Sequence, residues 1–238
     1  MRTHADSLGD SHVSALLRGD TALIRAWTGR WDLARLLGHA GLIMAGAGAY
    51  GAAMGWWRAP EQALFVAIKL PLIILLTTGG NALLNAMLAP LLGVNIGFRQ
   101  TFLAILMSFA SAAVILAAFS PLMGFVVWNA LPMSPTESIG VYSSIMLMHV
   151  AVIAFAGTAA NLRLLQLLRE LSGSAQSARR VLLAWLAGNL FLGSQLSWIL
   201  RPFIGSPGLP VQFLRDHPLN GNFYEAVFHS AMHLLNLD

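Results

Sequence analysis

Five long apolar segments are the feature that most constrains how this chain can fold. They cover residues 36–57, 62–91, 102–128, 139–162 and 181–200. A helix of about 20 apolar residues crosses the hydrocarbon core of a bilayer. Within that core the backbone must satisfy its own hydrogen bonds, which a helix does within one segment. The sequence therefore predicts an all-α integral membrane bundle of about five transmembrane helices.

Composition supports this class. Hydrophobic residues make up 57% of the chain and charged residues 10%, against roughly 25% charged residues in an ordinary soluble domain. The chain has no cysteine, which excludes disulfides, thiolate metal sites, iron–sulfur clusters and cysteine nucleophiles. No segment combines clustered basic residues with a nucleic-acid-binding motif, so we expect no nucleic-acid partner.

Three regions follow from the pattern of hydropathy. Residues 1–34 form a polar and then amphipathic segment with four arginines, which predicts either a helix on the membrane surface or a solvated tail. Charged residues interrupt any apolar stretch there, so we expect no cleaved signal peptide. Residues 35–200 form the transmembrane domain. Residues 201–238 are predicted to be an extracytoplasmic loop followed by an interfacial amphipathic helix.

The basic residues predict the orientation. With the N-terminus inside, ten of the 14 Lys and Arg residues fall on the cytoplasmic side, as the positive-inside rule favours. Tryptophan favours membrane interfaces and gives a second indication. The outer ends of the predicted spans carry Trp56, Trp57, Trp128 and Trp198, and the inner ends Trp27, Trp31 and Trp185. We expect a multi-pass protein of a bacterial inner membrane, with a cytoplasmic N-terminus and a periplasmic C-terminus.

The second apolar segment contains polar residues and helix-disrupting residues. Lys69, the only lysine in the chain, lies two residues before Pro71. A cation inside a membrane must reach the interface, pair, or serve a transport pathway. Asn81 and Asn85 share a helix face beside Gly79-Gly80, and predict either interhelical hydrogen bonds or a polar cavity. These residues indicate a discontinuous span and a possible pathway through Lys69, Asn81 and Asn85.

Small residues in the first apolar segment predict close helix packing. Ala47, Gly51 and Gly55 recur at four-residue spacing, which lets two backbones approach closely. We favour a partner helix within the same chain over one from another chain.

Histidines offer weak candidates for a cofactor or a metal. His149 lies inside the fourth segment, where an imidazole either packs through a hydrogen bond or binds haem iron or chlorophyll magnesium. Glu225, His229 and His233 recur every fourth residue on the last predicted helix, and His217 precedes them. That spacing suits zinc or copper, but it is also typical of the wet face of an interfacial helix. No cofactor is predicted, and haem, chlorophyll and a metal stay open as alternatives.

The stretch after the fifth segment is predicted to be a contact surface. Pro202 stops the helix, and Arg201 can reach lipid phosphates. Phe203 and Phe213 are apolar side chains on either side of a loop rich in proline and glycine. Asn222, followed three residues later by glutamate, has the spacing of a helix cap. The residues that we expect to contact a partner are Arg201, Pro202, Phe203, Phe213, Phe223 and Tyr224.

Four motifs carry a family resemblance: KLP at 69–71, FRQTF at 98–102, WILRPFIGSP at 198–207 and GNFYEAV at 221–227. On these motifs the chain resembles a group of bacterial five-pass membrane proteins that are themselves similar to the Yip family. The resemblance covers residues 69–227 and implies a five-helix fold with a recurring periplasmic motif. It implies no reaction. The acidic Tyr-Gly-Pro motif of eukaryotic Yip relatives, which are associated with membrane traffic and small GTPases, is missing here.

No catalytic motif is present in the sequence: there is no H-E-x-x-H, G-x-S-x-G, phosphate-binding loop or dinucleotide fingerprint. We therefore expect a non-enzymatic accessory or scaffold subunit that contacts membrane lipids and other membrane protein subunits. The alternatives are a small transporter or channel component, and a membrane subunit that binds haem, pigment or metal.

Overall fold

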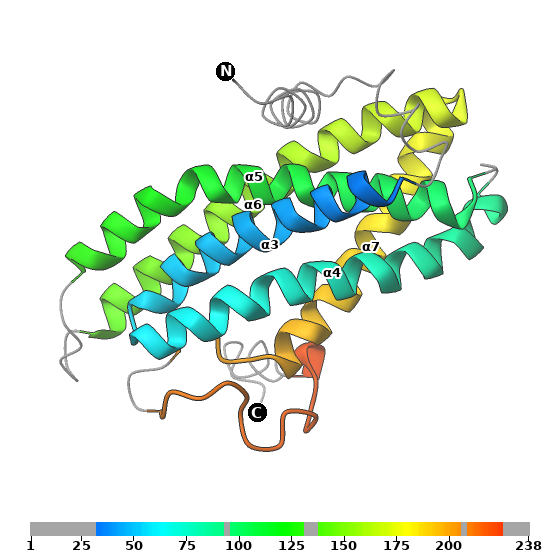
Figure 1. The fold of residues 1–238 in the computed structure, drawn as a ribbon. Coiled ribbons are helices and arrows are strands. Elements are labelled where there is room, and N and C mark those ends of the chain that lie inside the picture. The colour runs from blue at the N-terminus through cyan, green and yellow to red at the C-terminus, as the bar shows by residue number, and fades with distance from the viewer. Residues whose placement is uncertain (1–31, 93–95, 131–137, 206–208, 226–238) are drawn as a thin grey trace, which may run out of the picture.

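The computed structural model describes residues 32–92, 96–130, 138–205 and 209–225. Its ordered elements are five long helices (Figure 1), and the part of the chain that it describes contains no strand. The helices are α3 (Leu33–Trp56), α4 (Pro60–Leu91), α5 (Phe98–Asn129), α6 (Ser138–Ser172) and α7 (Ala175–Ile199). Each has the length and hydropathy to cross a membrane. The predicted all-α, five-span fold is confirmed. Of the N-terminal segment 1–34, predicted to be a surface helix or a solvated tail, residues 1–31 lie outside the described residues, and so does most of the final helix.

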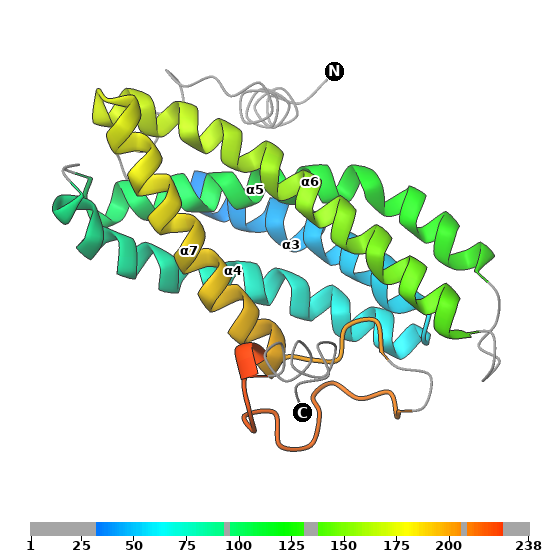
Figure 2. The same ribbon diagram turned by 180° about the vertical axis from the view of Figure 1, so that it is seen from behind.

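The five helices do not form a regular ring. Helix α3 packs against α4 and α5, α6 packs on α5, and α7 packs on α4. Helices α6 and α7 meet at their short connection and then diverge (Figure 2), so α7 crosses α4 at a steep angle. Consequently α7 ends beside the first half of α4, and the chain that follows runs underneath that half (Figure 1).

Helix α4 is continuous, so the prediction of a discontinuous second span is wrong. It runs through Pro71, Gly79 and Gly80 without a break. Gly80 has a packing role instead. A Cβ at Gly80 would lie 3.0 Å from a methyl carbon of Leu192 on α7, so the missing side chain makes room for the crossing helix.

The small residues of α3 lie against helices of the same chain. A Cβ on Gly51 would approach the Val66 carbonyl oxygen of α4 to 2.5 Å, and one on Gly55 would approach the Gln62 carbonyl oxygen to 2.5 Å. Ala47, four residues before Gly51 on the same face, is fully buried. The stripe Ala47–Gly51–Gly55 therefore lets the backbones of α3 and α4 touch, with the close geometry that small residues permit inside membranes.

The connection between α6 and α7 is shorter than the sequence indicates. The polar stretch 172–180 reads as a linker, yet α7 begins at Ala175. The Ser174 side chain accepts a hydrogen bond from the backbone N–H of Ser177 at 3.4 Å, which caps the helix. Ala178 is fully buried in the first turns. Capping and burial together make these polar residues helical.

Among the described residues, Trp56 and Trp128 lie at one end of the bundle and Trp185 lies in its core. Trp56 stacks on Trp128 at 6.2 Å between ring centroids, where α3 and α5 end. Trp185, expected at the opposite interface, is instead 1% exposed and belongs to the hydrophobic core. That expectation is wrong because α7 begins ten residues before this tryptophan, so Trp185 lies well inside the helix, where it packs against α4.

Candidate functional site: a lysine that holds the terminal segment

The site is centred on Lys69 in α4, whose side chain is fully buried. Its Nζ donates a hydrogen bond to the Pro202 carbonyl oxygen at 2.9 Å. The Nε2 of Gln62 donates to the same oxygen at 2.9 Å and to the Phe203 carbonyl oxygen at 2.6 Å. Lys69 and Gln62 lie seven residues apart on α4 and so share a helix face. Two consecutive carbonyl groups of the terminal segment are thereby satisfied by side chains of α4.

Three aromatic rings surround the ammonium group of Lys69. Its Nζ lies 4.9 Å from the ring centroid of Phe213, 5.8 Å from that of Phe203 and 6.0 Å from that of Phe65. A cation within about 6 Å of an aromatic face is attracted by the ring quadrupole. Phe65 and Phe213 also meet edge to face at 5.4 Å. We call Gln62, Phe65, Lys69, Pro202, Phe203 and Phe213 the lysine anchor.

The depth of the lysine anchor explains why α4 carries a lysine. Lys69 is nine residues after Pro60, the first residue of α4, which places it about 14 Å along the helix. The carbonyl of Pro202 therefore lies beside the first third of α4 rather than beyond its end. Irregular backbone at membrane depth is tolerated only where protein or water satisfies it. Here Lys69 and Gln62 supply the missing donors.

Further contacts hold the segment beyond the lysine anchor. The Arg58 Nη2, from the turn between α3 and α4, donates to the Leu209 carbonyl oxygen at 3.0 Å. Gly205 has a φ of 84°, a conformation that favours glycine. Ile204 is buried in a cluster with Tyr50 and Val66, so the segment inserts an apolar side chain between the helices.

Arg201 folds back on the end of α7. Its Nη1 donates to the Trp198 carbonyl oxygen at 2.6 Å, and its guanidinium carbon lies 3.8 Å from the Trp198 ring centroid. Burial lowers the pKa of the Arg201 guanidinium, and the positive charge of Arg215 lowers it further.

The second half of the segment returns to α7. The Trp198 Nε1 donates to the Asn220 carbonyl oxygen at 3.2 Å. Tyr224 stacks on Phe191 at 5.9 Å between centroids. The Asn222 Oδ1 accepts from the Glu225 backbone N–H at 2.9 Å, which confirms that Asn222 caps the next helical turn. The segment is thus tied to α4 at its start and to α7 at its end.

The residues predicted to contact a partner divide into two groups. Pro202 is buried, and Phe203 and Phe213 are only partly exposed because they face the chain's own α4. Phe223 and Tyr224 are 37% and 43% exposed. The second pair, with Leu219 at 75% exposed, leaves apolar surface of the segment exposed.

Asn81 and Asn85 form a separate polar group between α4 and α7. The Asn81 Nδ2 donates to the Trp185 carbonyl oxygen at 3.0 Å and to the Asn189 Oδ1 at 2.6 Å. The Asn85 Nδ2 donates to the Asn81 carbonyl oxygen at 2.8 Å and also contacts the Asn81 Oδ1. Both asparagines of α4 are buried. We call Asn81, Asn85 and Asn189 the amide cluster; it joins two helices through hydrogen bonds of the kind expected inside membranes.

His149 is buried against α3. Its Nδ1 lies 2.9 Å from the Tyr50 hydroxyl oxygen, a hydrogen bond, and the two rings meet edge to face at 5.4 Å. The other ring nitrogen, Nε2, is buried without a hydrogen-bond partner among the described residues. The contact with Tyr50 is what a packing histidine makes, and binding of haem or chlorophyll by His149 stays a prediction.

The metal site predicted on the last helix falls mostly outside the described residues. Glu225 is described, and its carboxylate contacts the Asn222 side chain at 3.4 Å. His229 and His233 lie beyond residue 225. Within the described part of the chain, no three His, Asp or Glu side chains gather as a metal site would require. A metal at Glu225, His229 and His233 stays a prediction.

Sequence reasoning singled out Lys69 and Pro202 separately but did not join them, and it missed Gln62, Phe65 and Arg58. A usable signal was present: Gln62 and Lys69 are two long polar donors seven residues apart in an apolar segment. Their acceptors lie more than 130 residues later in the chain, so spacing along the helix could not identify them.

No protein-family profile, no curated protein and no solved structure matches this chain. The resemblance to Yip-like five-pass proteins therefore stays a prediction.

Proposed function

We propose that this chain is a non-enzymatic accessory or scaffold subunit of a bacterial inner-membrane assembly. In this proposal the N-terminus is cytoplasmic, and residues 201–205 and 209–225 form a fixed periplasmic platform for another membrane protein. The observation that carries it is the hydrogen bond from the buried Lys69 ammonium to the Pro202 carbonyl oxygen at 2.9 Å. Burying a cation in a membrane costs free energy. Here the buried ammonium group fixes the shape of an irregular segment.

The apolar surface of the platform supports a protein partner. Leu219, Phe223 and Tyr224 remain exposed although the segment that carries them is held at both ends. Rigid aromatic side chains on a preorganised surface lose little entropy on binding and are enriched in protein interfaces.

The contacts of the predicted pathway residues favour the scaffold over a transporter. The donor groups of Lys69 and Asn81 bond carbonyl oxygens of the same chain, and Asn81 also bonds Asn189. A pathway would need polar groups that are free to meet a passing solute.

Photo-crosslinking in native membranes tests the proposal. A photoreactive amino acid at Leu219 should give a discrete adduct with one membrane protein, and Lys69→Met should reduce it because the platform loses its fixed shape. Leu72→Met, on the exposed side of α4, should leave the adduct intact. A probe at Leu183, exposed on α7, should give no such adduct. The absence of an adduct from position 219, or one that Lys69→Met leaves unchanged, would contradict the scaffold proposal.

The orientation has its own test because the chain has no cysteine. Leu219→Cys should react with a membrane-impermeant maleimide in cells with a permeable outer membrane. Gln176→Cys, at the opposite end of α7, should react only after the inner membrane is opened. The reverse pattern would overturn the proposed topology.

A further inference from the structure

A groove lies between α6 and α7, where the two helices diverge from their connection (Figure 2). Its volume is about 420 Å³, within the roughly 300–1,000 Å³ of typical ligand sites. Most of the wall is apolar, and two polar residues, Thr158 and Asn161, also contribute. The lining residues are Ala154, Gly157, Thr158, Asn161, Leu162, Leu182 and Leu186.

An arginine lies above each wall of this groove. On α6, Arg169 follows Leu162 by seven residues, which is two helical turns and therefore the same face. On α7, Arg179 precedes Leu186 by seven residues and again shares its face. Seven residues span about 10 Å along a helix. Both side chains are exposed, and within the described residues neither forms an ion pair.

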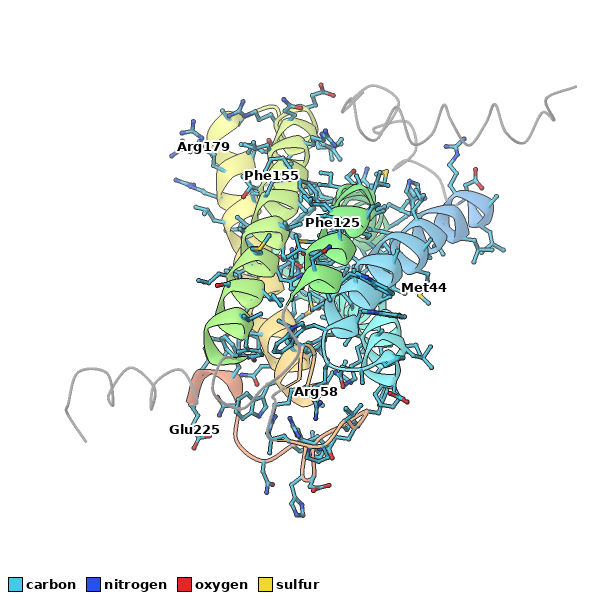
Figure 3. The ribbon with its side chains drawn as sticks, turned by 90° about the vertical axis from the view of Figure 1, so that its left-hand side faces the viewer. Met44, Arg58, Phe125, Phe155, Arg179 and Glu225 are labelled. Atoms are coloured by element: carbon cyan, nitrogen blue, oxygen red, sulfur yellow. The ribbon has the colours of Figure 1, made fainter. Side chains whose placement is uncertain are left out.

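The two arginines lie at the end of the bundle away from the lysine anchor. Figure 3 places Arg179 at one end and both Arg58 and Glu225 at the other. Helix α6 has 35 residues, a length of about 52 Å, and exceeds the roughly 30 Å of a hydrocarbon core. The end of α6 that carries Arg169 can therefore reach the headgroup region while the groove stays among acyl chains.

We infer that this groove binds an anionic phospholipid, with one acyl chain between α6 and α7 and the phosphate between Arg169 and Arg179. Two arginines on converging helices can donate to phosphate oxygens as a pair. Glu170, the described acidic residue next to Arg169 in the chain, is rotated by about 100° from it around α6. This site is independent of the proposed platform, which lies at the opposite end of the bundle.

The charge requirement is tested with purified full-length protein and native mass spectrometry, using dioleoyl phosphatidylglycerol and dioleoyl phosphatidylcholine as probes. The wild type should retain phosphatidylglycerol in preference to phosphatidylcholine. Arg169→Gln and Arg179→Gln should each reduce that preference about fivefold, because one basic residue contributes roughly 1 kcal/mol to the attraction of an anionic lipid. Arg180→Gln, about 100° away from Arg179 on α7, is the matched control and should change the preference less than Arg179→Gln.

The acyl-chain position is tested by filling the groove. Leu186→Trp should lower the binding of both lipids, whereas Leu183→Trp, on the exposed side of α7, should not. The proposal is overturned by equal retention of the two lipids in the wild type, or by an unchanged preference in the Arg169→Gln/Arg179→Gln variant. It is also overturned if the two Trp variants behave alike, or if a second copy of the chain covers the groove in place of lipid.

Discussion

Helix α4 carries two polar groups in its apolar surface, and they stabilise different parts of the molecule. In the amide cluster, Asn81 bonds a carbonyl and an amide of α7, so both partners belong to regular helices. In the lysine anchor, Lys69 and Gln62 bond carbonyls of irregular backbone. The first group joins helix to helix, and the second joins a helix to a segment that has no hydrogen-bond ladder of its own.

The difference shows why one group contains a charge and the other does not. A helix satisfies its own backbone, so the amide cluster adds only a contact worth about 0.6–2 kcal/mol for each bond. The carbonyls of Pro202 and Phe203 have no helical partner at membrane depth. Each would cost about 1–3 kcal/mol if left unsatisfied. Long donors such as lysine and glutamine reach them from the neighbouring helix.

The largest expected effect comes from removing both donors of the lysine anchor. Gln62→Leu combined with Lys69→Met leaves two buried carbonyl groups unsatisfied. The free energy of opening residues 200–225 should fall by about 2–6 kcal/mol, measured by amide hydrogen exchange. Peptides from α3 and α5 should keep most of their protection, since these helices pack mainly against each other and against α4. Leu64→Met with Leu72→Met, on the exposed side of α4, is the control. Unchanged protection of the segment in the double variant would show that other contacts hold it.

An intermediate effect is expected where the amide cluster meets α7. A Cβ on Gly188 would collide with the Asn81 Oδ1, so Gly188→Ala should destabilise the chain by about 1–3 kcal/mol through overpacking. Gly79→Ala is the matched control, because no atom lies within 4 Å of its added Cβ. It should stabilise α4 by up to about 1 kcal/mol. Thermal unfolding in detergent distinguishes the two variants. Equal shifts in their melting temperatures would contradict close packing at Gly188.

The smallest effect tests the aromatic rings of the lysine anchor. Phe213→Leu keeps an apolar side chain but removes the ring nearest to the Lys69 ammonium, at 4.9 Å. The opening free energy of residues 200–225 should fall by about 0.5–2 kcal/mol. Phe223→Leu, at a more exposed ring of the same segment, should lower this opening free energy less than Phe213→Leu does. A larger loss from Phe223→Leu would indicate that the segment depends mainly on its contacts with α7.

The helices themselves could be predicted from the sequence because each contains a predominantly apolar run of sufficient length. The predicted span 62–91 differs from α4 (Pro60–Leu91) by two residues at its start. The start of α7 was predicted six residues late. Its polar first turns depend on a cap at Ser174 and on burial of Ala178. A hydropathy profile detects neither a cap nor tertiary burial. Trp185 was misplaced for the same reason.

The sequence by itself determined that this chain crosses a membrane about five times, since hydropathy and length are properties of each segment alone. It also predicted that the lone Lys69 must reach the interface, pair or serve a pathway, because a cation is costly in hydrocarbon. Only the tertiary structure decided which of these occurs, and with which partner. The steep crossing of α7 over α4 brings the Pro202 carbonyl to the depth of Lys69, and a crossing angle is set by packing between helices that are distant in sequence. The same divergence of α7 from α6 opens the groove beneath Arg169 and Arg179.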